Sequence, residues 1–149
     1  MSWPEYVDFL MKKPGMVVGA IVSNTDGKIW ANKGDFAFKT HKEVVKNLKG
    51  EEQAFEVDEW ALLNDLFKTG KTDPIKGFWM NHKKYVLLGF EENHAYFKCR
   101  NGGACIAKTE KTFVVGIYAT KDEDKNSWAG GNCNSVVEEL ASMLITSKF

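Results

Sequence analysis

The sequence predicts an α+β fold in which a central antiparallel β-sheet carries helices on its faces. Three observations predict it: apolar residues at helical spacing near both ends of the chain, helical patterns in its middle, and a run of short strands in its distal half. Sheets and amphipathic helices bury their apolar faces against each other, so these elements favour a layered arrangement. With 149 residues, the chain fits one core, and we expect a single domain over residues 1–149.

The first predicted element is a short helix over residues 2–12. Ser2 and Glu5 form a capping-box pattern, and Pro4 lies in the first turn, where its missing N–H costs nothing. Pro14 and the glycine after it end the helix. Two strands follow, joined by the turn sequence Asn-Thr-Asp-Gly. These strands are predicted over residues 16–23 and 28–31.

The middle of the chain predicts two helices, and the distal half predicts strands. A short helix is expected over residues 41–49, and a longer one over 56–69, whose apolar residues form a stripe at helical spacing. From Gly77 onward, short β-branched and aromatic stretches alternate with tight turns, which indicates an antiparallel meander. The five expected strands cover 77–81, 84–91, 94–100, 103–109 and 112–119. A polar loop over 120–131 leads to a last helix over about 133–146.

Charge and composition narrow the possible functions. Lys plus Arg and Asp plus Glu both number 20, so no net positive charge attracts nucleic acid. No apolar run reaches the roughly 20 residues of a membrane-spanning helix, and the first residues do not have the pattern of a signal peptide. The odd number of cysteines, three, favours free thiols in a reducing compartment. We therefore expect a cytoplasmic protein without a cofactor.

Several stretches resemble the profilin family, in order and at compatible spacing. They are the opening Ser2-Trp3-x-x-Tyr6-Val7-Asp8, the segment from Ala20 through Asp26-Gly27 to Trp30, the pairs Lys84-Tyr85 and Lys108-Thr109, the strand Val114–Tyr118, and the close from Gly131 to Leu144. The resemblance implies a profilin-like fold, with N- and C-terminal helices side by side on one face of the sheet and shorter helices on the other. Residues 50–76 look longer than the matching stretch of plant or fungal members.

Recognition of a proline-rich peptide needs an aromatic floor, because a polyproline II helix is stiff, extended and free of internal hydrogen bonds. Trp and Tyr offer contact area together with a polar atom for the peptide carbonyls. The terminal helices that the resemblance places side by side would bring such residues together with a Trp from the hairpin. The predicted contact residues are Trp3, Tyr6, Trp30, Met143, Leu144 and Phe149. The alternative is that these side chains only pack the two helices together.

The resemblance also implies an actin-binding face formed by the distal strands and the start of the last helix. Carried over position by position, the candidates are Lys84, Lys98, Arg100, Lys108, Trp128, Gly131, Asn134, Ser135 and Glu138. A mixed polar and basic patch of this kind would steer and hold an acidic partner. Each lysine alone is also what a solvated strand edge carries, and Asn134 has a rival role as a helix cap.

The partners implied by the family are monomeric actin, proline-rich proteins such as formins, and phosphoinositides. The implied function is regulation of actin polymerisation through monomer buffering and delivery to formin-type elongators, in association with the cytoskeleton. Phosphoinositides would bind exposed basic residues, and two groups are equal candidates. One group is Lys83, Lys84, Lys98 and Arg100, and the other is Lys12 and Lys13.

Other classes of protein are less well supported by the residues. His82, His94, Cys99 and Cys105 match no zinc-ligand spacing, so we expect no metal site. No cysteine has a nearby histidine and acid that would make it a nucleophile, so we expect no enzyme. The main rival is a small α/β sensory or trafficking scaffold, which would bind a small ligand or a partner protein.

Overall fold

The computed structural model describes residues 2–46, 48–120 and 129–149. The elements run in the order α1 (Trp3–Met11), β1 (Met16–Ser23), β2 (Ile29–Lys33), β3 (Thr40–Lys46), β4 (Glu52–Asp58), α2 (Glu59–Thr69), β5 (Phe78–Met80), β6 (Lys83–Glu91), β7 (His94–Cys99), β8 (Gly102–Lys108), β9 (Thr112–Ala119) and α3 (Ala129–Thr146). Within the described residues, no helix has the length and apolar character needed to cross a bilayer. Trp128 and most of the predicted loop 120–131 lie outside the described residues.

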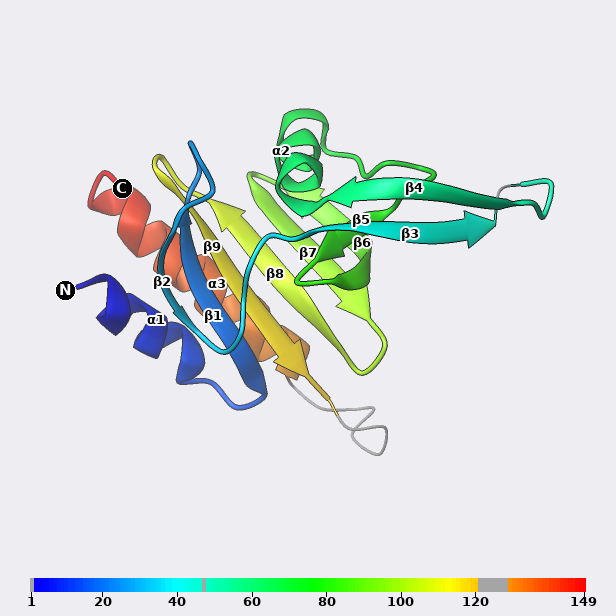
Figure 1. Cartoon of the computed structure of the whole chain (residues 1–149). Coiled ribbons are helices and arrows are strands. Elements are labelled where there is room, and N and C mark those ends of the chain that lie inside the picture. Colours follow the sequence, from blue (N-terminus) through cyan, green and yellow to red (C-terminus); the bar gives the residue numbers. More distant parts are fainter. Residues whose placement is uncertain (1, 47, 121–128) are drawn as a thin grey trace.

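A seven-stranded antiparallel sheet forms the centre, in the order β2-β1-β9-β8-β7-β6-β5 (Figure 1). The strands from β5 to β9 form the predicted meander, and β1 pairs with β9. Two of the hairpins turn in two residues with positive φ, at Asn81-His82 and Glu92-Asn93. Such turns match the twist of the paired strands. The meander therefore follows from local turn chemistry.

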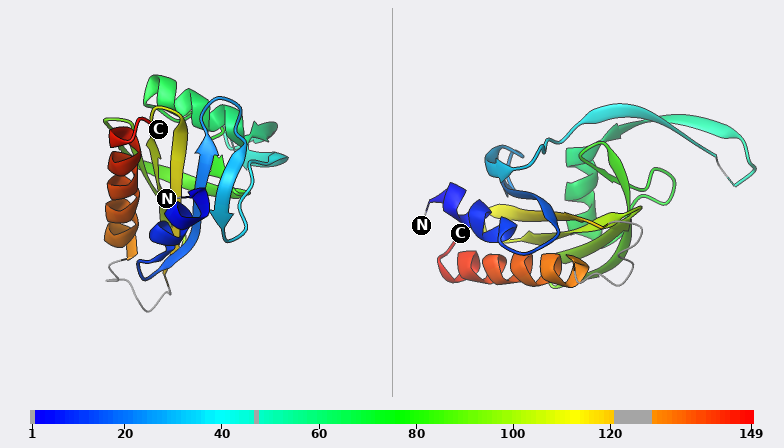
Figure 2. Two further views of the ribbon diagram at one scale, coloured as in Figure 1. Left: turned by 90° about the vertical axis from the view of Figure 1, so that its left-hand side faces the viewer. Right: turned by 90° about the horizontal axis from the view of Figure 1, so that it is seen from below.

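The helices cover the two faces of the sheet. α1 and α3 lie on one face, and α2 lies on the other (Figure 2). The first face buries Val7, Leu10, Val137 and Leu140 against the sheet, whereas the second buries Leu63 and Leu66 of α2. The predicted fold class is confirmed, including the pairing of the terminal helices on one face.

The predicted helix over 41–49 is wrong, because residues 41–46 belong to strand β3. It pairs with β4 along its whole length and forms a two-stranded ribbon that extends away from the sheet (Figure 1). Burial alternates along β3, with His41, Glu43 and Val45 less exposed than their neighbours, and this period of two is typical of a strand. The predicted helix over 56–69 begins later, at Glu59, since Asp58 ends β4 and caps α2 by accepting a hydrogen bond from the Ala61 N–H at 3.1 Å. In the part of the chain that the structure describes, the second face thus carries one helix, with the ribbon beside it.

Candidate functional site

Three aromatic rings, from three parts of the chain, contact the ring of Trp3. Its ring centroid lies 5.5 Å from that of Tyr6, 5.0 Å from that of Trp30 and 5.3 Å from that of Phe149. We call these four residues the terminal aromatic cluster. Centroid separations of this size are typical of favourable aromatic pairs. The structure therefore brings together four of the six residues predicted to contact a proline-rich peptide.

The elements around the cluster hold its rings in place. Trp3 and Tyr6 are one helical turn apart on α1, on the same side of the helix as Val7 and Leu10, which are buried against the sheet and hold the helix in place. At the end of the chain, the Phe149 N–H donates to the Leu144 carbonyl at 2.8 Å, which folds the last residues back against α3. The backbone oxygen of Phe149 in turn accepts hydrogen bonds from the turn between β8 and β9. The backbone at both ends of the chain is thus held in place by packing and hydrogen bonds, which fixes the positions of the rings.

The exposed fractions of the six predicted side chains show which of them a peptide could contact. Trp30 is 37% exposed, and the other three rings of the cluster are half-buried, so the cluster presents aromatic surface to solvent. Met143 is half-buried on α3. Leu144 is fully buried at 0% exposure, which corrects its prediction as a contact residue. Its side chain belongs to the core between the two terminal helices and supports the cluster from within.

A second surface lies on β6 and β7, beyond the part of the sheet that α3 covers. The helix packs on β8 and β9. The Tyr96 hydroxyl donates to the Glu138 carboxylate of α3, so the side chain of Tyr96 is on the helix face of β7. Lys98 lies two residues further along the strand and shares this face, and its register partner Val86 does too. Lys84, Lys98 and Val86 are all exposed.

Sequence reasoning missed two apolar residues of this surface. Val86 and Leu88 are each 63% exposed, although β6 lies inside the sheet between β5 and β7. Their neighbours Tyr85 and Leu87 pack against the opposite face. Alternation along the strand predicts that its side chains point to two faces of the sheet. Which of these faces stays exposed depends on the position of α3, which does not extend over β6. Exposed apolar side chains beside lysines are typical of a surface that binds a protein.

The exposed side of α3 forms a shallow, open groove with β6 and β7. Its lining residues are Glu91, Tyr96, Gly131, Asn134, Ser135, Glu138, Glu139 and Ser142. Four of the predicted actin contacts thus lie together, around the hydrogen bond between Tyr96 and Glu138. Burial, reinforced by this carboxylate, raises the pKa of Tyr96, so its hydroxyl keeps the proton and remains the donor. The groove is acidic, whereas the neighbouring strands are basic.

Two further predicted contacts differ in their placement. Arg100 is exposed in the turn between β7 and β8, close in sequence to Lys98. Lys108 is at the far end of β8, roughly 20 Å away at ~3.3 Å per residue. In register it pairs with Phe113, whose ring contacts Trp60 of α2, so Lys108 is on the other face of the sheet. The structure therefore separates Lys108 from the remaining candidates.

Two of the three cysteine thiols are held in an unreactive form. All three cysteines are free, and Cys105 and Cys133 are buried. Burial raises the pKa of Cys133 to about 12, and it raises that of Cys105 as well. Both groups stay protonated at neutral pH and are poor nucleophiles, since the thiolate is the reactive form.

Comparison with known proteins adds an independent line of evidence. A family model described as Profilin matches residues 1–149. The chain is 33% identical over 150 residues to a profilin of Tetrahymena pyriformis, with 96% of this chain and 95% of the relative covered. It is 29% identical to profilin-2 of Acanthamoeba castellanii over the full length of both chains.

Solved structures agree with the sequence comparison. The crystal structure of Acanthamoeba castellanii profilin II has a TM-score of 0.70 at 25% identity, over 99% of this chain and 100% of that one. Mouse profilin IIa, solved in complex with a double repeat from the FH1 domain of mDia1, has a TM-score of 0.59 over 100% of both chains. At 17% identity, this second likeness concerns the fold alone.

Proposed function

The chain belongs to the profilin family, and we propose that it binds monomeric actin on one surface and proline-rich peptides on another, and so regulates actin polymerisation. The observation that carries the proposal is the terminal aromatic cluster, in which three rings gather around Trp3 at the surface. The alternative, a small sensory or trafficking scaffold module that binds a small ligand or a partner protein, is not favoured by the family match.

The cluster suits a weak peptide ligand. If each of the four rings loses roughly 50 Å² of exposed area, the gross gain is about 5 kcal/mol at ~25 cal/mol per Å². Association costs of ~4 kcal/mol or more offset most of this gain. One proline tract therefore binds weakly, and repeated tracts bind better because the second contact is intramolecular. Mouse profilin IIa has been solved in complex with a double repeat from the FH1 domain of mDia1, and we propose proline-rich proteins such as formins as partners here.

The surface on β6 and β7 suits a protein partner. Val86 and Leu88 supply exposed apolar area, and Lys84 and Lys98 flank Val86. Apolar contacts at the centre with charges at the rim are typical of protein interfaces. The actin contacts proposed here are these four residues, together with Arg100 and the four predicted residues of the groove at α3.

The two surfaces are far enough apart for both partners to bind at once. Trp30 is on β2 and Val86 on β6, five strand spacings away across the sheet. At ~4.8 Å per spacing the separation is roughly 24 Å. A chain that holds actin and a proline tract together would deliver monomers to a formin-type elongator.

We further propose that the protein acts without enzymatic activity, in the cytoplasm at the actin cytoskeleton. Phosphoinositide binding remains a prediction with two candidate groups, both exposed. Lys83, Lys84, Lys98 and Arg100 lie on and beside the proposed actin surface, and Lys12 and Lys13 follow α1.

Two binding measurements test the main proposal. The purified chain is passed over immobilised poly-L-proline, and its affinity for monomeric actin is then measured by fluorescence anisotropy with labelled actin. We expect retention on the resin and saturable binding of actin. Failure of both measurements would overturn the proposal.

A further inference from the structure

The β3–β4 ribbon has an unpaired strand edge along β4. Its two strands pair with each other from Thr40 opposite Asp58 to Lys46 opposite Glu52, and neither strand joins the seven-stranded sheet. In an antiparallel ladder, alternate residues direct N–H and C=O toward the partner strand, and the residues between them direct these groups away. Within the described residues, no strand or turn takes up the outward backbone groups of β4. A further strand can therefore pair with this edge.

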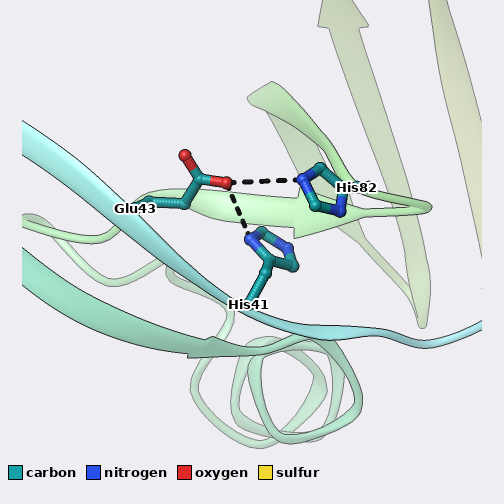
Figure 3. A group of neighbouring side chains, drawn as sticks. All are labelled: His41, Glu43 and His82. Carbon is teal, nitrogen blue, oxygen red and sulfur yellow. Dashed lines mark hydrogen bonds and ion pairs between the residues drawn. The ribbon is translucent and has the colours of Figure 1, made fainter.

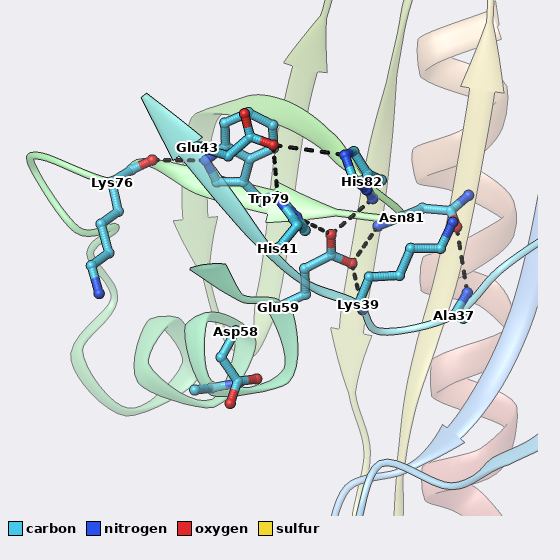
Figure 4. Close-up of polar contacts among 11 residues, drawn as sticks. Ala37, Lys39, His41, Glu43, Asp58, Glu59, Lys76, Trp79, Asn81 and His82 are labelled. Atoms are coloured by element: carbon cyan, nitrogen blue, oxygen red, sulfur yellow. Dashed lines mark hydrogen bonds and ion pairs between the residues drawn. The ribbon is translucent and has the colours of Figure 1, made fainter. Parts of the chain in front are cut away.

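Hydrogen bonds fix the base of the ribbon to the rest of the fold. The buried carboxylate of Glu59, directly after β4, accepts hydrogen bonds from the N–H groups of Asn81 and His82, each at 2.8 Å (Figure 4). The ring of His41 contacts Glu59 at 2.9 Å and Glu43 at 2.8 Å. Glu43 also faces His82, at 3.7 Å (Figure 3). Because one end of the ribbon is held in this way, the open edge is preorganised, which lowers the entropic cost of binding.

The face of the ribbon opposite His41 and Glu43 carries rows of side chains that face each other across the two strands. The rows are charged, apolar and charged in turn, and they pair Lys42 with Glu56, Val44 with Ala54, and Lys46 with Glu52. All six side chains are exposed. Within the described residues, neither Glu52 nor Glu56 forms an ion pair. Both carboxylates are thus available to a cation on the open side of β4.

The charges of β4 determine which strand suits its open edge. The strand has three acidic residues and no basic one. An antiparallel pair of two β4 strands centred on Phe55 would place Glu52 opposite Asp58, so like charges disfavour this pairing. A strand with a basic residue beside Glu56, another beside Glu52 and an apolar residue midway has the complementary pattern. The edge therefore favours a basic segment.

We propose that the open edge of β4 binds an extended basic segment of a partner protein by strand addition. The segment has two Lys or Arg residues four positions apart and an apolar residue midway, which is the pattern that β3 presents to β4. Backbone hydrogen bonds supply the affinity, and the side chains supply the specificity. A third strand also stabilises the ribbon, because a two-stranded hairpin is marginally stable by itself. No residue of β4 belongs to the proposed actin or peptide surface.

A synthetic peptide with the sequence of residues 40–46 is a suitable probe, because the structure defines the register of this sequence against β4. Its binding is measured by fluorescence anisotropy of the fluorescein-labelled peptide, with the full chain as titrant. We expect saturable binding. The double variant Glu52→Lys/Glu56→Lys should bind the peptide roughly tenfold more weakly or worse, because attraction becomes repulsion. The control Glu92→Lys/Glu110→Lys has the same net charge, with both changes at exposed positions outside the ribbon, and should bind as the wild type does.

Two N-methylated forms of the peptide distinguish strand addition from charge attraction alone. Methyl groups on the backbone nitrogens of alternate residues block the hydrogen bonds of one edge of the peptide and leave its charge unchanged. The two forms carry the methyl groups on opposite edges. We expect one form to lose binding and the other to keep it, because the peptide pairs through one edge. Equal binding of both forms, or no saturable binding of the unmethylated peptide, would overturn the proposal.

Sedimentation velocity tests another occupant of the edge, which is β3 of a second copy of the chain. Pairing of this kind leaves β4 of the second copy open, so it would continue into assemblies that grow with concentration. We expect the chain to sediment as a monomer throughout the concentration range of the peptide titration. Assemblies that grow with concentration and are abolished by Glu52→Lys/Glu56→Lys would overturn the proposal and assign the edge to self-association.

Discussion

The Thr109 hydroxyl donates a hydrogen bond to the backbone oxygen of Phe149, with the two oxygens 2.9 Å apart. This contact joins the turn between β8 and β9 to the last residue, 40 positions further along the chain. The Lys111 N–H donates to the same oxygen. The Phe149 ring is part of the terminal aromatic cluster. The turn between β8 and β9 therefore helps to position the cluster, although none of the turn's own side chains belongs to it.

Removal of this hydroxyl should weaken the binding of proline-rich peptides. In Thr109→Val the shape is kept, but the bonds to Phe149 and to Thr112 are lost. We expect the free energy of unfolding to fall by about 1–2 kcal/mol and the affinity for poly-L-proline to fall severalfold. Tryptophan fluorescence titration measures the affinity, and urea denaturation the stability. The control is Thr69→Val, which removes a hydroxyl that bonds to Asp65 in α2. Equal peptide affinity in all three chains would contradict the role of the anchor.

The exposed ring of the cluster provides a direct test of the peptide surface. Trp30→Ala removes a side chain that is 37% exposed and contacts the Trp3 ring, so the fold should tolerate it. An aromatic contact at the centre of an interface is worth ~1.5–2 kcal/mol or more, so retention on poly-L-proline should weaken at least tenfold. Trp79→Phe serves as the control, because that ring contacts His41 at the ribbon base. Undiminished binding by Trp30→Ala would assign the cluster to helix packing.

The proposed actin surface is tested separately from the peptide surface. Val86→Asp places a charge on a side chain that is 63% exposed, so stability should change by less than about 0.5 kcal/mol. Affinity for monomeric actin should fall at least tenfold, because the substitution removes apolar contact area and because desolvating a carboxylate at an interface is costly, and retention on poly-L-proline should persist. Ile75→Asp makes the same kind of change at a residue that is 57% exposed and lies away from β6 and β7. If both variants lose actin equally, charge alone explains the effect.

Local patterns predicted most of the fold, because most of its elements are specified by neighbouring residues. Capping at Ser2 and Asn-Thr-Asp-Gly at the first hairpin act over a few positions, and the predicted bounds lie within a few residues of those observed. The ribbon was missed because Val44, Val45 and Leu48 also match helical spacing. A strand becomes the better interpretation only when β4 is present as its partner.

The candidate sites were less predictable, since they depend on contacts between distant segments. Residues of the terminal aromatic cluster were found through the family resemblance and not from their spacing. Leu144 was misplaced because a helical stripe does not reveal which of its members is deepest. Nothing in the local sequence distinguishes Glu59, because its hydrogen-bond donors come from residues 39, 41, 81 and 82.

The buried carboxylate of Glu59 should contribute strongly to stability. Each of its oxygens accepts two hydrogen bonds: Oε1 from Lys39 and Asn81, and Oε2 from His82 and His41. In Glu59→Gln, an amide N–H₂ replaces one oxygen and faces two donors in either orientation. Loss of these buried hydrogen bonds, which leaves donors facing an amide N–H₂, should lower the free energy of unfolding by roughly 3 kcal/mol. Urea denaturation measures this loss, with Glu139→Gln, at an exposed position of α3, as the control. Equal midpoints for the two variants would mean that the network around Glu59 adds nothing to the stability of the fold.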